Sequence, residues 1–445
     1  MTGSVSTDTI FALSSGRGRA GVAVIRVSGP ASRLALDKLA GGIPKRAAAR
    51  LRRLEDPATG EALDEALVLY FEGPASFTGE DIAEFHVHGG LAVVEGVLEA
   101  LGRLEGLRPA EPGEFARRAF ANGKIDLTQA EGLADLIEAE TRAQRRQALR
   151  QTGGALKELC AQWRDGIVRA ASLLEAAIDF SDEADVPDLV ENGARPVVSA
   201  LRDALSRHLA DARKGERLRD GLRVVLAGAP NAGKSSLLNA LSRRDAAIVS
   251  GEPGTTRDVI EVHLDLDGYP VTLIDTAGLR EAENEVEREG VRRTLVRAGD
   301  ADLVLWLVDA SAPLWDVPDE LSGADVQHLL NKTDLADPSP PQGIDPLRLS
   351  VLNGEGVGAV LRALEVRAAE LLEAGEPAVV TRARQRRELE ACVAGLETFL
   401  AGDPIELELR AEDLRVAAQA LGRVTGAVDV EDILDRIFGD FCIGK

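Results

Sequence analysis

Residues 228–236 read Gly-Ala-Pro-Asn-Ala-Gly-Lys-Ser-Ser, a pattern suited to holding the phosphates of a nucleotide. An apolar, strand-like run precedes them and a helical run follows them. Gly228 and Gly233 permit backbone angles that a side chain would forbid, so successive N–H groups can point at phosphate oxygens. Lys234 supplies positive charge to the β- and γ-phosphates, and the Ser235 hydroxyl can bind Mg²⁺. The motif predicts a phosphate-binding loop but does not identify the nucleotide.

Three polar motifs further along the chain identify it. The loop Gly254–Asp258 contains Thr256, whose hydroxyl can complete the Mg²⁺ shell while a γ-phosphate is present. The turn Asp275–Gly278 follows a strand, and its carboxylate can hold Mg²⁺ through water while its last amide donates to the γ-phosphate. Asn331–Asp334 reads Asn-Lys-Thr-Asp, and its final carboxylate can accept both N–H donors of guanine, which adenine does not offer. In this order the motifs predict GTP rather than ATP.

The elements that position these motifs lie within residues 221–375. Apolar runs at 222–227, 271–274 and 303–308 predict buried strands, and helical runs alternate with them. The segment Ser350–Gly356 can close over the base with backbone amides. It is the weakest of the motifs because Val351 and Leu352 replace the more usual Ser-Ala pair. The alternation predicts a Ras-like, doubly wound parallel sheet with a P-loop.

The remaining sequence predicts two further domains. Residues 1–120 contain strand-like runs bounded by Gly and Pro, which favour a mixed α/β domain. Residues 121–220 and 376–445 show helical spacing of apolar residues and predict a single helical domain. The GTPase domain, 221–375, would be inserted in that helical domain. The predicted fold class is therefore multidomain, α/β plus all-α.

Composition limits the classes of function. The chain has 445 residues and a net charge of −22, which argues against a protein that coats nucleic acid and leaves weak, partner-assisted RNA contact through a local basic patch. No apolar run approaches the length of a membrane span, and no signal peptide is evident. Three scattered cysteines do not form a disulfide framework. We therefore expect a cytoplasmic protein.

Taken together, the motifs resemble the MnmE family, also called TrmE, of tRNA modification GTPases. The nucleotide motifs and the terminal Phe441-Cys-Ile-Gly-Lys445 carry this resemblance. Further stretches resemble the family's N-terminal tetrahydrofolate-binding and dimerisation domain. These are Asp8–Ile10, Gly16–Gly18, Ile25–Gly29, Ser76–Asp81, His88–Gly90, Pro112–Phe115 and Asn122–Leu127. The match covers essentially the whole chain.

The resemblance implies a homodimer that hydrolyses GTP when its nucleotide domains meet around a K⁺ ion. Such an ion can neutralise transition-state charge as an arginine finger does. The implied K⁺ ligands are the side chains of Asn231 and Thr255 and the backbone carbonyls of Ser250 and Glu252, and the implied Mg²⁺ ligands are Ser235 and Thr256. Glu287 aligns with the catalytic glutamate that orients the attacking water, although its spacing alone favours an ordinary solvated carboxylate.

The resemblance also implies the full binding sets. For GTP the set is Asn231, Ala232, Gly233, Lys234, Ser235, Ser236, Ser250, Thr255, Thr256, Asp275, Thr276, Ala277, Gly278, Asn331, Lys332, Asp334, Ser350, Val351 and Leu352. For 5-formyltetrahydrofolate or a related folate it is Arg26, Glu80, Lys124 and Lys445. Cations suit the glutamate tail of a folate, and a carboxylate can accept from the amino edge of its pterin. Taken singly, each of these four is more often a surface charge.

Cys442, the fourth residue from the end, has three interpretations. It mimics a prenylation site, which Gly444 and Lys445 fit badly. It is equally the kind of small residue that proteins bury. The resemblance favours a catalytic thiol near the folate site, acting as a nucleophile or in a redox step.

The function implied is a K⁺-stimulated GTPase that acts with a flavin-dependent partner of the MnmG (GidA) type. Together they would form the carboxymethylaminomethyl (or aminomethyl) group at C5 of the tRNA wobble uridine, and GTP hydrolysis would drive conformational change. Two alternatives share the nucleotide motifs. A ribosome-assembly GTPase switch would need neither the folate-like module nor Cys442, and a signalling GTPase would be tethered by that cysteine.

Overall fold

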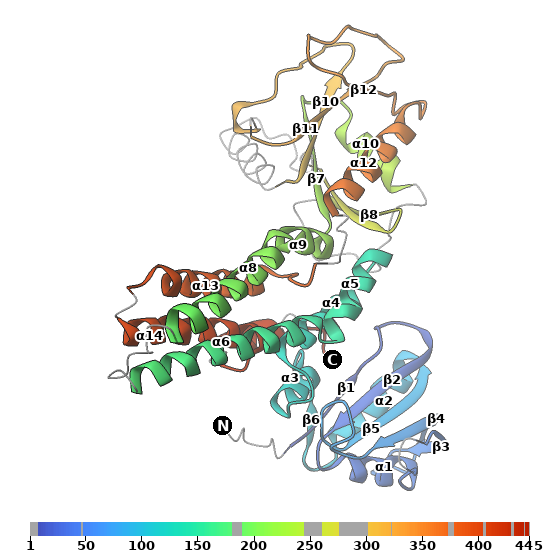
Figure 1. Cartoon of the computed structure of the whole chain (residues 1–445). Coiled ribbons are helices and arrows are strands. Elements are labelled where there is room, and N and C mark those ends of the chain that lie inside the picture. Colours follow the sequence, from blue (N-terminus) through green and yellow to red (C-terminus); the bar gives the residue numbers. More distant parts are fainter. Residues whose placement is uncertain are drawn as a thin grey trace, which may run out of the picture. The chain divides into compact units, whose positions relative to one another are not determined.

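Figure 1 shows the protein as a computed structural model. The structure describes residues 8–45, 48–179, 189–243, 260–275, 301–321, 323–372, 378–403, 406–428, 431–439 and 441–444. The chain divides into two compact units, one of residues 1–134 and 421–445 and the other of residues 135–420. The two ends of the chain therefore belong to the same unit.

The N-terminal unit is built on a six-stranded sheet. Its strands are β1 (Thr9–Leu13), β2 (Ala20–Ser28), β3 (Arg50–Glu55), β4 (Ala62–Phe71), β5 (Ile82–Gly89) and β6 (Leu107–Pro109). Their order is β3-β4-β5-β2-β1-β6, and every pair is antiparallel except β1 with β6. Alternate strand residues such as Ile25, Val27 and Phe85 are fully buried. They share a core with residues of α1 (Ser32–Ala40) and α2 (Leu91–Gly102).

A second, smaller core in this unit joins the middle and the end of the chain. Helix α3 (Glu114–Ala121) contacts α15 (Glu431–Gly439). Ala116, Leu127, Phe438 and Phe441 are buried together in this cluster. The packing holds the C-terminal residues on the unit that contains β1.

Long helices flank the nucleotide-binding segment on both sides. They are α4 (Leu127–Glu138), α5 (Arg142–Thr152), α6 (Ala155–Asp179), the π-helical turn η1 (Leu189–Ala194), α8 (Arg195–Ala210), α9 (Ala212–Asp220), α13 (Ala383–Ala401) and α14 (Leu407–Thr425). Helix α6 buries Cys160, Trp163, Ile167 and Ala170 at helical spacing. Helix α8 contacts both α6 and α13, so helices from either side of the segment lie together. Among the helices described, none is long and apolar enough to span a bilayer.

The second six-stranded sheet carries the nucleotide motifs. Its strands are β7 (Leu222–Gly228), β8 (Ile260–Leu266), β9 (Tyr269–Asp275), β10 (Leu303–Asp309), β11 (Val326–Asn331) and β12 (Leu347–Arg348). Their order is β12-β11-β10-β7-β9-β8, with only β8 antiparallel to its neighbour. Residues Leu303–Val308 of β10 are all buried, as a strand inside a parallel sheet requires. Helices α10 (Lys234–Ser242) and α12 (Val357–Leu372) share one apolar core with these strands.

The predicted alternation of strand and helix fails after β10. In the described parts of the connections 310–325 and 332–346, the only helical turn is the 3₁₀ turn Asp319–Leu321. Trp315 packs on the core that contains Trp306, and the Trp306 indole donates to the Leu314 carbonyl at 3.1 Å. Clustered prolines in these connections disfavour a helix. The predicted fold class is nevertheless confirmed, because the mixed α/β sheet, the helical region and the doubly wound sheet are all present.

Candidate functional site

The phosphate loop connects β7 to α10. Gly228, Asn231 and Gly233 have φ angles of 139°, 62° and 104°, in the region that glycine adopts freely and asparagine tolerates. A Cβ on Gly228 would collide with the Leu307 carbonyl of the neighbouring strand β10. The loop therefore lies against the sheet and leads into the N-terminal end of a helix, where backbone N–H groups favour an anion.

Lys234 and Ser235 are the first residues of α10 and approach the end of β9. The Lys234 Nζ donates to the carbonyl oxygens of Gly228 and Ala229 at 3.0 and 2.9 Å. Burial lowers the pKa of Lys234, against the opposing effect of Asp275. The Ser235 hydroxyl donates to Asp275 Oδ2 at 2.8 Å. A hydroxyl and a carboxylate oxygen side by side are hard ligands of the kind that Mg²⁺ prefers, so these residues fit that ion.

Asn331 joins the phosphate loop to the loop predicted to close over the base. Its side chain lies at the end of β11 and is 2% exposed. The Nδ2 donates to the Ala232 carbonyl at 2.8 Å, and the Val351 amide donates to Oδ1 at 3.1 Å. A Cβ on Gly233 would collide with the same Nδ2. One buried amide thus brings three of the predicted GTP-binding segments together.

The other residues of the Asn-Lys-Thr-Asp motif are held by short hydrogen bonds. The Ser350 hydroxyl donates to Asp334 Oδ1 at 2.5 Å, which leaves this exposed carboxylate oriented by a buried serine. Lys332 Nζ donates to Asp309 Oδ2 at 2.6 Å. Burial would raise the pKa of Asp309, but hydrogen bonds from Lys332 and Ser311 outweigh it and hold the pKa below its usual value. The motif is therefore fixed on both sides of β11.

Several predicted residues fall outside the described part of the chain. They are Ser250, Glu252, Thr255, Thr256, Thr276, Ala277, Gly278, Glu287 and Lys445. Of the predicted K⁺ ligands, the structure describes Asn231, which is exposed and follows the Gly228–Pro230 turn. Ser236 and Leu352 are also exposed, the latter by 90%.

Arg26 lies on β2 among aromatic and acidic side chains. Its guanidinium pairs with Glu84 Oε1 at 2.9 Å. The same group lies 5.9 and 5.8 Å from the ring centroids of Phe77 and Phe115. Aromatic faces stabilise a cation, so the arginine is held by one carboxylate and two rings. Its side chain remains 24% exposed and accessible to an anionic group.

Glu80 and Lys124 meet at one loop. The Glu80 carboxylate accepts from the Ser28 hydroxyl at 2.7 Å, and Lys124 Nζ donates to the Pro74 carbonyl at 2.9 Å. The Lys124 stem lies beside Gly79, where an added Cβ would be 3.4 Å from its Cγ. The structure thus brings Glu80 and Lys124 together, and Ser28 links Glu80 to the strand that carries Arg26.

Sequence reasoning missed the charged network behind Glu80. The Arg118 guanidinium, 7% exposed, donates to Asp8 and Glu114 at 2.9 and 3.0 Å and to both oxygens of Glu80 at 3.2 Å. Burial would lower the pKa of Arg118, but these carboxylates outweigh it and raise the pKa. The spacing of Glu114 and Arg118 on α3 was a usable signal, since residues four apart share a helix face. Asp8 and Glu80 are too distant in sequence to reveal their part.

The C-terminal tail docks on the N-terminal unit. The Ser14 hydroxyl donates to the Gly444 carbonyl at 2.8 Å, and the Gly113 amide donates to the Cys442 carbonyl at 3.5 Å. Gly444 has φ of 98°, and a Cβ there would collide with the Leu13 carbonyl. Cys442 is exposed. Gly113 precedes the helix that carries Phe115, one of the two rings beside Arg26. The tail is therefore connected through this helix to one of the predicted folate-binding residues.

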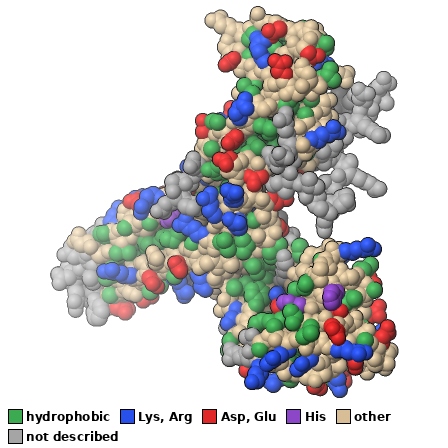
Figure 2. Space-filling view, turned by 90° about the vertical axis from the view of Figure 1, so that its right-hand side faces the viewer, with side chains coloured by type: hydrophobic (Ala, Val, Ile, Leu, Met, Phe, Trp, Pro, Cys, Tyr) green, Lys and Arg blue, Asp and Glu red, His purple; other side chains and the backbone are tan. Residues whose placement is uncertain are grey.

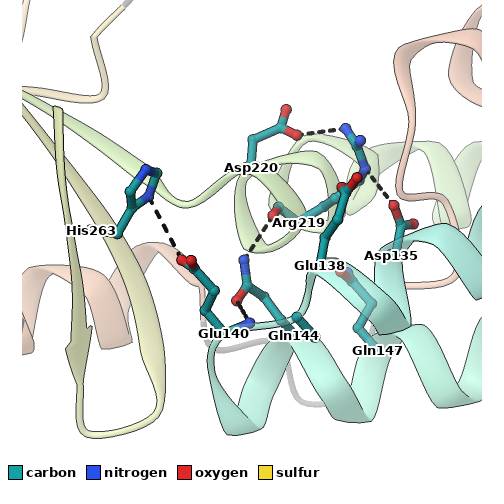
Figure 3. Close-up of a pocket in the computed structure, with 9 residues that line it drawn as sticks. Asp135, Glu138, Glu140, Gln144, Gln147, Arg219, Asp220 and His263 are labelled. Carbon is teal, nitrogen blue, oxygen red and sulfur yellow. Dashed lines mark hydrogen bonds and ion pairs between the residues drawn. The ribbon is translucent and has the colours of Figure 1, made fainter. Parts of the chain in front are cut away.

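A polar pocket of about 280 Å³ lies where α4, α5, α9 and β8 meet (Figure 3). It is lined by Asp135, Glu138, Ala139, Glu140, Gln144, Gln147, Arg219, Asp220 and His263. Arg219 Nε pairs with Asp135 Oδ1 at 2.8 Å, and Gln144 Nε2 donates to the Arg219 carbonyl at 2.9 Å. His263 Nδ1 lies 3.8 Å from Glu140 Oε2. These contacts connect a strand of the nucleotide-binding sheet to the bend between α4 and α5.

Comparisons with known proteins agree on one family. A family model for the N-terminus of the GTP-binding protein TrmE matches residues 9–124, and one for the MnmE helical domain matches residues 127–442. The tRNA modification GTPase MnmE of Methylorubrum populi is 55% identical over 99% of this chain and 99% of its own length. The protein of the same name from Parvibaculum lavamentivorans is 53% identical over 98% and 100%. The G domain of the T. maritima FeoB iron transporter is 29% identical over 33% of this chain and 98% of its own, with a TM-score of 0.27.

Proposed function

The chain belongs to the MnmE family of tRNA modification GTPases, and from this we propose that it hydrolyses GTP in the course of modifying tRNA in the cytoplasm. The finer reaction we propose is the formation of a carboxymethylaminomethyl or aminomethyl group at C5 of the wobble uridine. A flavin-dependent partner of the MnmG type would supply the redox chemistry. Identity of 55% over nearly the full length supports carrying the family's activity to this chain.

The observation that carries the GTPase part of the proposal is the position of Asn331. Its amide contacts both Ala232 of the phosphate loop and Val351 of the loop predicted to close over the base. A nucleotide whose phosphates lie on the first loop therefore has its base directed toward Asp334. That carboxylate, oriented by Ser350, accepts from the two N–H groups of guanine. The arrangement favours GTP over ATP because adenine lacks those donors.

The cations are assigned by the chemistry of the residues. Ser235, next to Asp275 and together with Thr256, would hold Mg²⁺, which would neutralise negative charge on the phosphates. Asn231 and Thr255, with the carbonyls of Ser250 and Glu252, would hold K⁺ in the homodimer. Lys234 stays close to the β- and γ-phosphate positions because its Nζ is anchored to the loop it follows. Glu287 would orient the attacking water.

The N-terminal unit is proposed to hold the folate. Arg26, Lys124 and Lys445 would bind the anionic tail, and Glu80 would accept hydrogen bonds from the pterin. Lys124 contacts the loop that carries Glu80, and hydrogen bonds from Arg118 hold the Glu80 carboxylate in position. The exposed Cys442 belongs to the same unit, which supports a role for its thiol in the carbon chemistry.

The proposed domains are residues 1–120 for folate binding and dimerisation, 121–220 with 376–445 for the helical domain, and 221–375 for the inserted GTPase. Hydrolysis in the last would change the arrangement of the helices that flank it. The contacts around the pocket of Figure 3 offer a route, because His263 and Glu140 lie on opposite sides of that junction.

Nucleoside analysis of tRNA from cells that lack the gene tests the proposal. We expect the modified wobble uridine to be absent and to return with the parent gene. A Cys442→Ser gene should restore GTP turnover without restoring the nucleoside. The purified protein should hydrolyse GTP much faster in KCl than in NaCl. Unaltered wobble uridines in the deletion strain would contradict the tRNA assignment, and equal rates in the two salts would contradict the K⁺ assignment.

A further inference from the structure

A group of cations on the N-terminal unit has no part in the function proposed above. Residues 33–53 contain seven Lys and Arg side chains against a single carboxylate, in a chain whose net charge is −22. We call the exposed members with known surroundings the basic strip. They are Lys38 on α1, Lys45 in the loop that follows, and Arg50 and Arg52 on β3.

These cations lack the partners that other cations of the unit have. Within the described residues, no carboxylate pairs with a member of the basic strip, and Arg52 donates only to the Leu51 carbonyl, at 3.4 Å. Several other arginine side chains of the unit are paired with carboxylates, as Arg26 is with Glu84 and Arg103 with Asp56. The whole chain has 74 Asp and Glu against 52 Lys and Arg. Where carboxylates are in excess, a group of cations that remains unpaired is open to an external anion.

The fold places the elements that carry the basic strip next to one another. Strand β3 is the edge of its sheet, and α1 contacts β3. Arg50 and Arg52 lie two residues apart, so their side chains leave the same side of the strand, about 6.6 Å apart along it. Figure 2 shows Lys and Arg side chains gathered along the rim of the N-terminal unit. A row of cations at this spacing suits a polyanion with regularly repeated charges better than a single small anion.

Edge protection is the simpler explanation of charge on β3. Charged side chains keep an exposed edge strand from pairing with another chain. That role accepts either sign and accounts for Arg53 and Glu55, which pair at 3.2 Å on this strand. It does not extend to Lys38 on the helix or to Lys45 in the loop. The excess of seven cations over one carboxylate in residues 33–53 therefore requires a second explanation.

We propose that the basic strip binds the phosphate backbone of tRNA. The inference rests on the proposed function, which makes tRNA the substrate, and adds the surface that contacts it. Lys and Arg that neutralise phosphates release counterions, so they provide affinity that depends on salt and not on base sequence. Contacts to the phosphate backbone also fix the position and orientation of the bound RNA. Sequence discrimination is left to other contacts.

Binding of a fluorescently labelled tRNA transcript to the full-length protein, measured by anisotropy between 50 and 200 mM KCl, tests the proposal. The variant Arg50→Glu/Arg52→Glu keeps the edge strand charged but reverses its sign. We expect its affinity to fall about tenfold or more and the slope of log K against log salt to decrease by roughly 2, about one for each phosphate that is no longer neutralised. The variant Arg50→Lys/Arg52→Lys should bind tRNA much as the parent does.

Arg202→Glu/Arg207→Glu on α8 is the matched control, since it changes the net charge equally at another exposed surface. We expect its affinity for tRNA to stay within about twofold of the parent value. GTP hydrolysis should be unchanged in all variants, and elution on size exclusion should remain that of the parent because the edge keeps its charge.

Three results would overturn the basic strip as an RNA surface. They are parental affinity and salt slope in the Glu variant, an equal loss in the α8 control, and a parent that binds vesicles of anionic lipid while ignoring tRNA. None of these would touch the proposed function, which stands or falls on wobble-uridine analysis in cells. Conversely, if the parent gene restores the modified uridine and the Glu variant binds tRNA normally, only the present inference fails.

Discussion

The nucleotide site and the N-terminal site both hold their functional groups in fixed positions, but by different means. In the first, backbone does most of the positioning: Gly228 and Gly233 allow a loop to approach a strand and an amide, and Asn331 ties two loops through main-chain atoms. In the second, charged side chains hold one another, with Arg118 in contact with three carboxylates. The first site is therefore sensitive to added volume, and the second to removal of charge.

The largest expected effect is on the N-terminal unit. Arg118→Met leaves the largely buried Glu80 without its cation, while Glu114 keeps Arg108 at 2.6 Å. Losing one partner of a buried pair costs about 3–5 kcal/mol. Hydrogen exchange on the full-length protein should show faster opening of the strands of this unit and little change in the nucleotide-binding sheet. Its neighbour provides the control: Arg117 pairs with Asp435 at 3.0 Å, where the two side chains are 47% and 80% exposed. Arg117→Met should cost less than about 1 kcal/mol. Similar losses in both variants would remove the distinction between buried and exposed pairs.

Added volume gives the next effect, at the phosphate loop. Gly233→Ala places a methyl group against the Asn331 amide at a φ of 104°. Strain of this kind costs about 2–3 kcal/mol, so GTP affinity should fall roughly 30- to 150-fold by titration calorimetry. Gly358→Ala, in helix α12, is the control, because the nearest atom to an added Cβ is a flexible arginine end 3.5 Å away. If GTP binds Gly233→Ala as tightly as it binds this control, close backbone packing is not what positions the groups of the nucleotide site.

This contrast explains why one site was easier to predict than the other. The residues of the phosphate loop are consecutive, and the spacing of its glycines indicates the backbone geometry. The loop Gly228–Ser236 could therefore be predicted from the sequence. The network around Arg118 joins Asp8 to a helix more than a hundred positions later, and no local pattern records that contact. Only the pair Glu114 and Arg118 had a signal, through its helical spacing.

The fold divides in a similar way. Strands were predictable where whole runs were apolar, as in β10, because a strand buried on both faces leaves no polar alternation. The edge strand β3 was missed, since four of its six residues are Arg or Glu and its pairing with β4 provides the structure. The missing helices after β10 were not anticipated either. There, Trp315 and neighbouring loop residues supply the apolar cover that a helix would otherwise give.

The C-terminal tail should be sensitive to added side-chain volume, although it packs on the N-terminal unit, whose site is held by charged side chains. Gly444→Ala forces the chain away from the Leu13 carbonyl and from Ser14. We expect roughly tenfold slower tRNA modification, from a displacement worth ~1.4 kcal/mol, with unchanged GTP hydrolysis. Nucleoside analysis and phosphate release measure the two activities. Gly439→Ala is the matched control because nothing lies within 4 Å of an added Cβ there. Equal modification rates in the two variants would mean that docking of the tail is not needed.

The smallest effect concerns an ion pair at the nucleotide site. Lys332 and Asp309 are 31% and 13% exposed, so solvent screens their pairing, and Lys332→Met should cost only about 1 kcal/mol at pH 7. The folded-state pKa of Asp309 lies below its ordinary 3.8. Its stabilising effect is therefore complete above that value and is lost as the pH falls through the folded-state pKa. The stabilities of parent and variant in urea unfolding should differ at pH 7, and the difference should begin to shrink below about pH 4.

Lys214→Met tests whether that difference belongs to the pair itself. Lys214 and Asp211 lie 3.3 Å apart with exposures of 41% and 48%, so breaking this contact should change stability by no more than about 0.5 kcal/mol. If Lys332→Met costs nearly as much stability as Arg118→Met, or if its cost does not shrink as the pH falls below about 4, the nucleotide site depends on charged side chains as the N-terminal site does. If instead Lys332→Met costs little stability and that cost disappears in acid, while Gly233→Ala loses much of its GTP affinity, the backbone is what positions the groups of the nucleotide site.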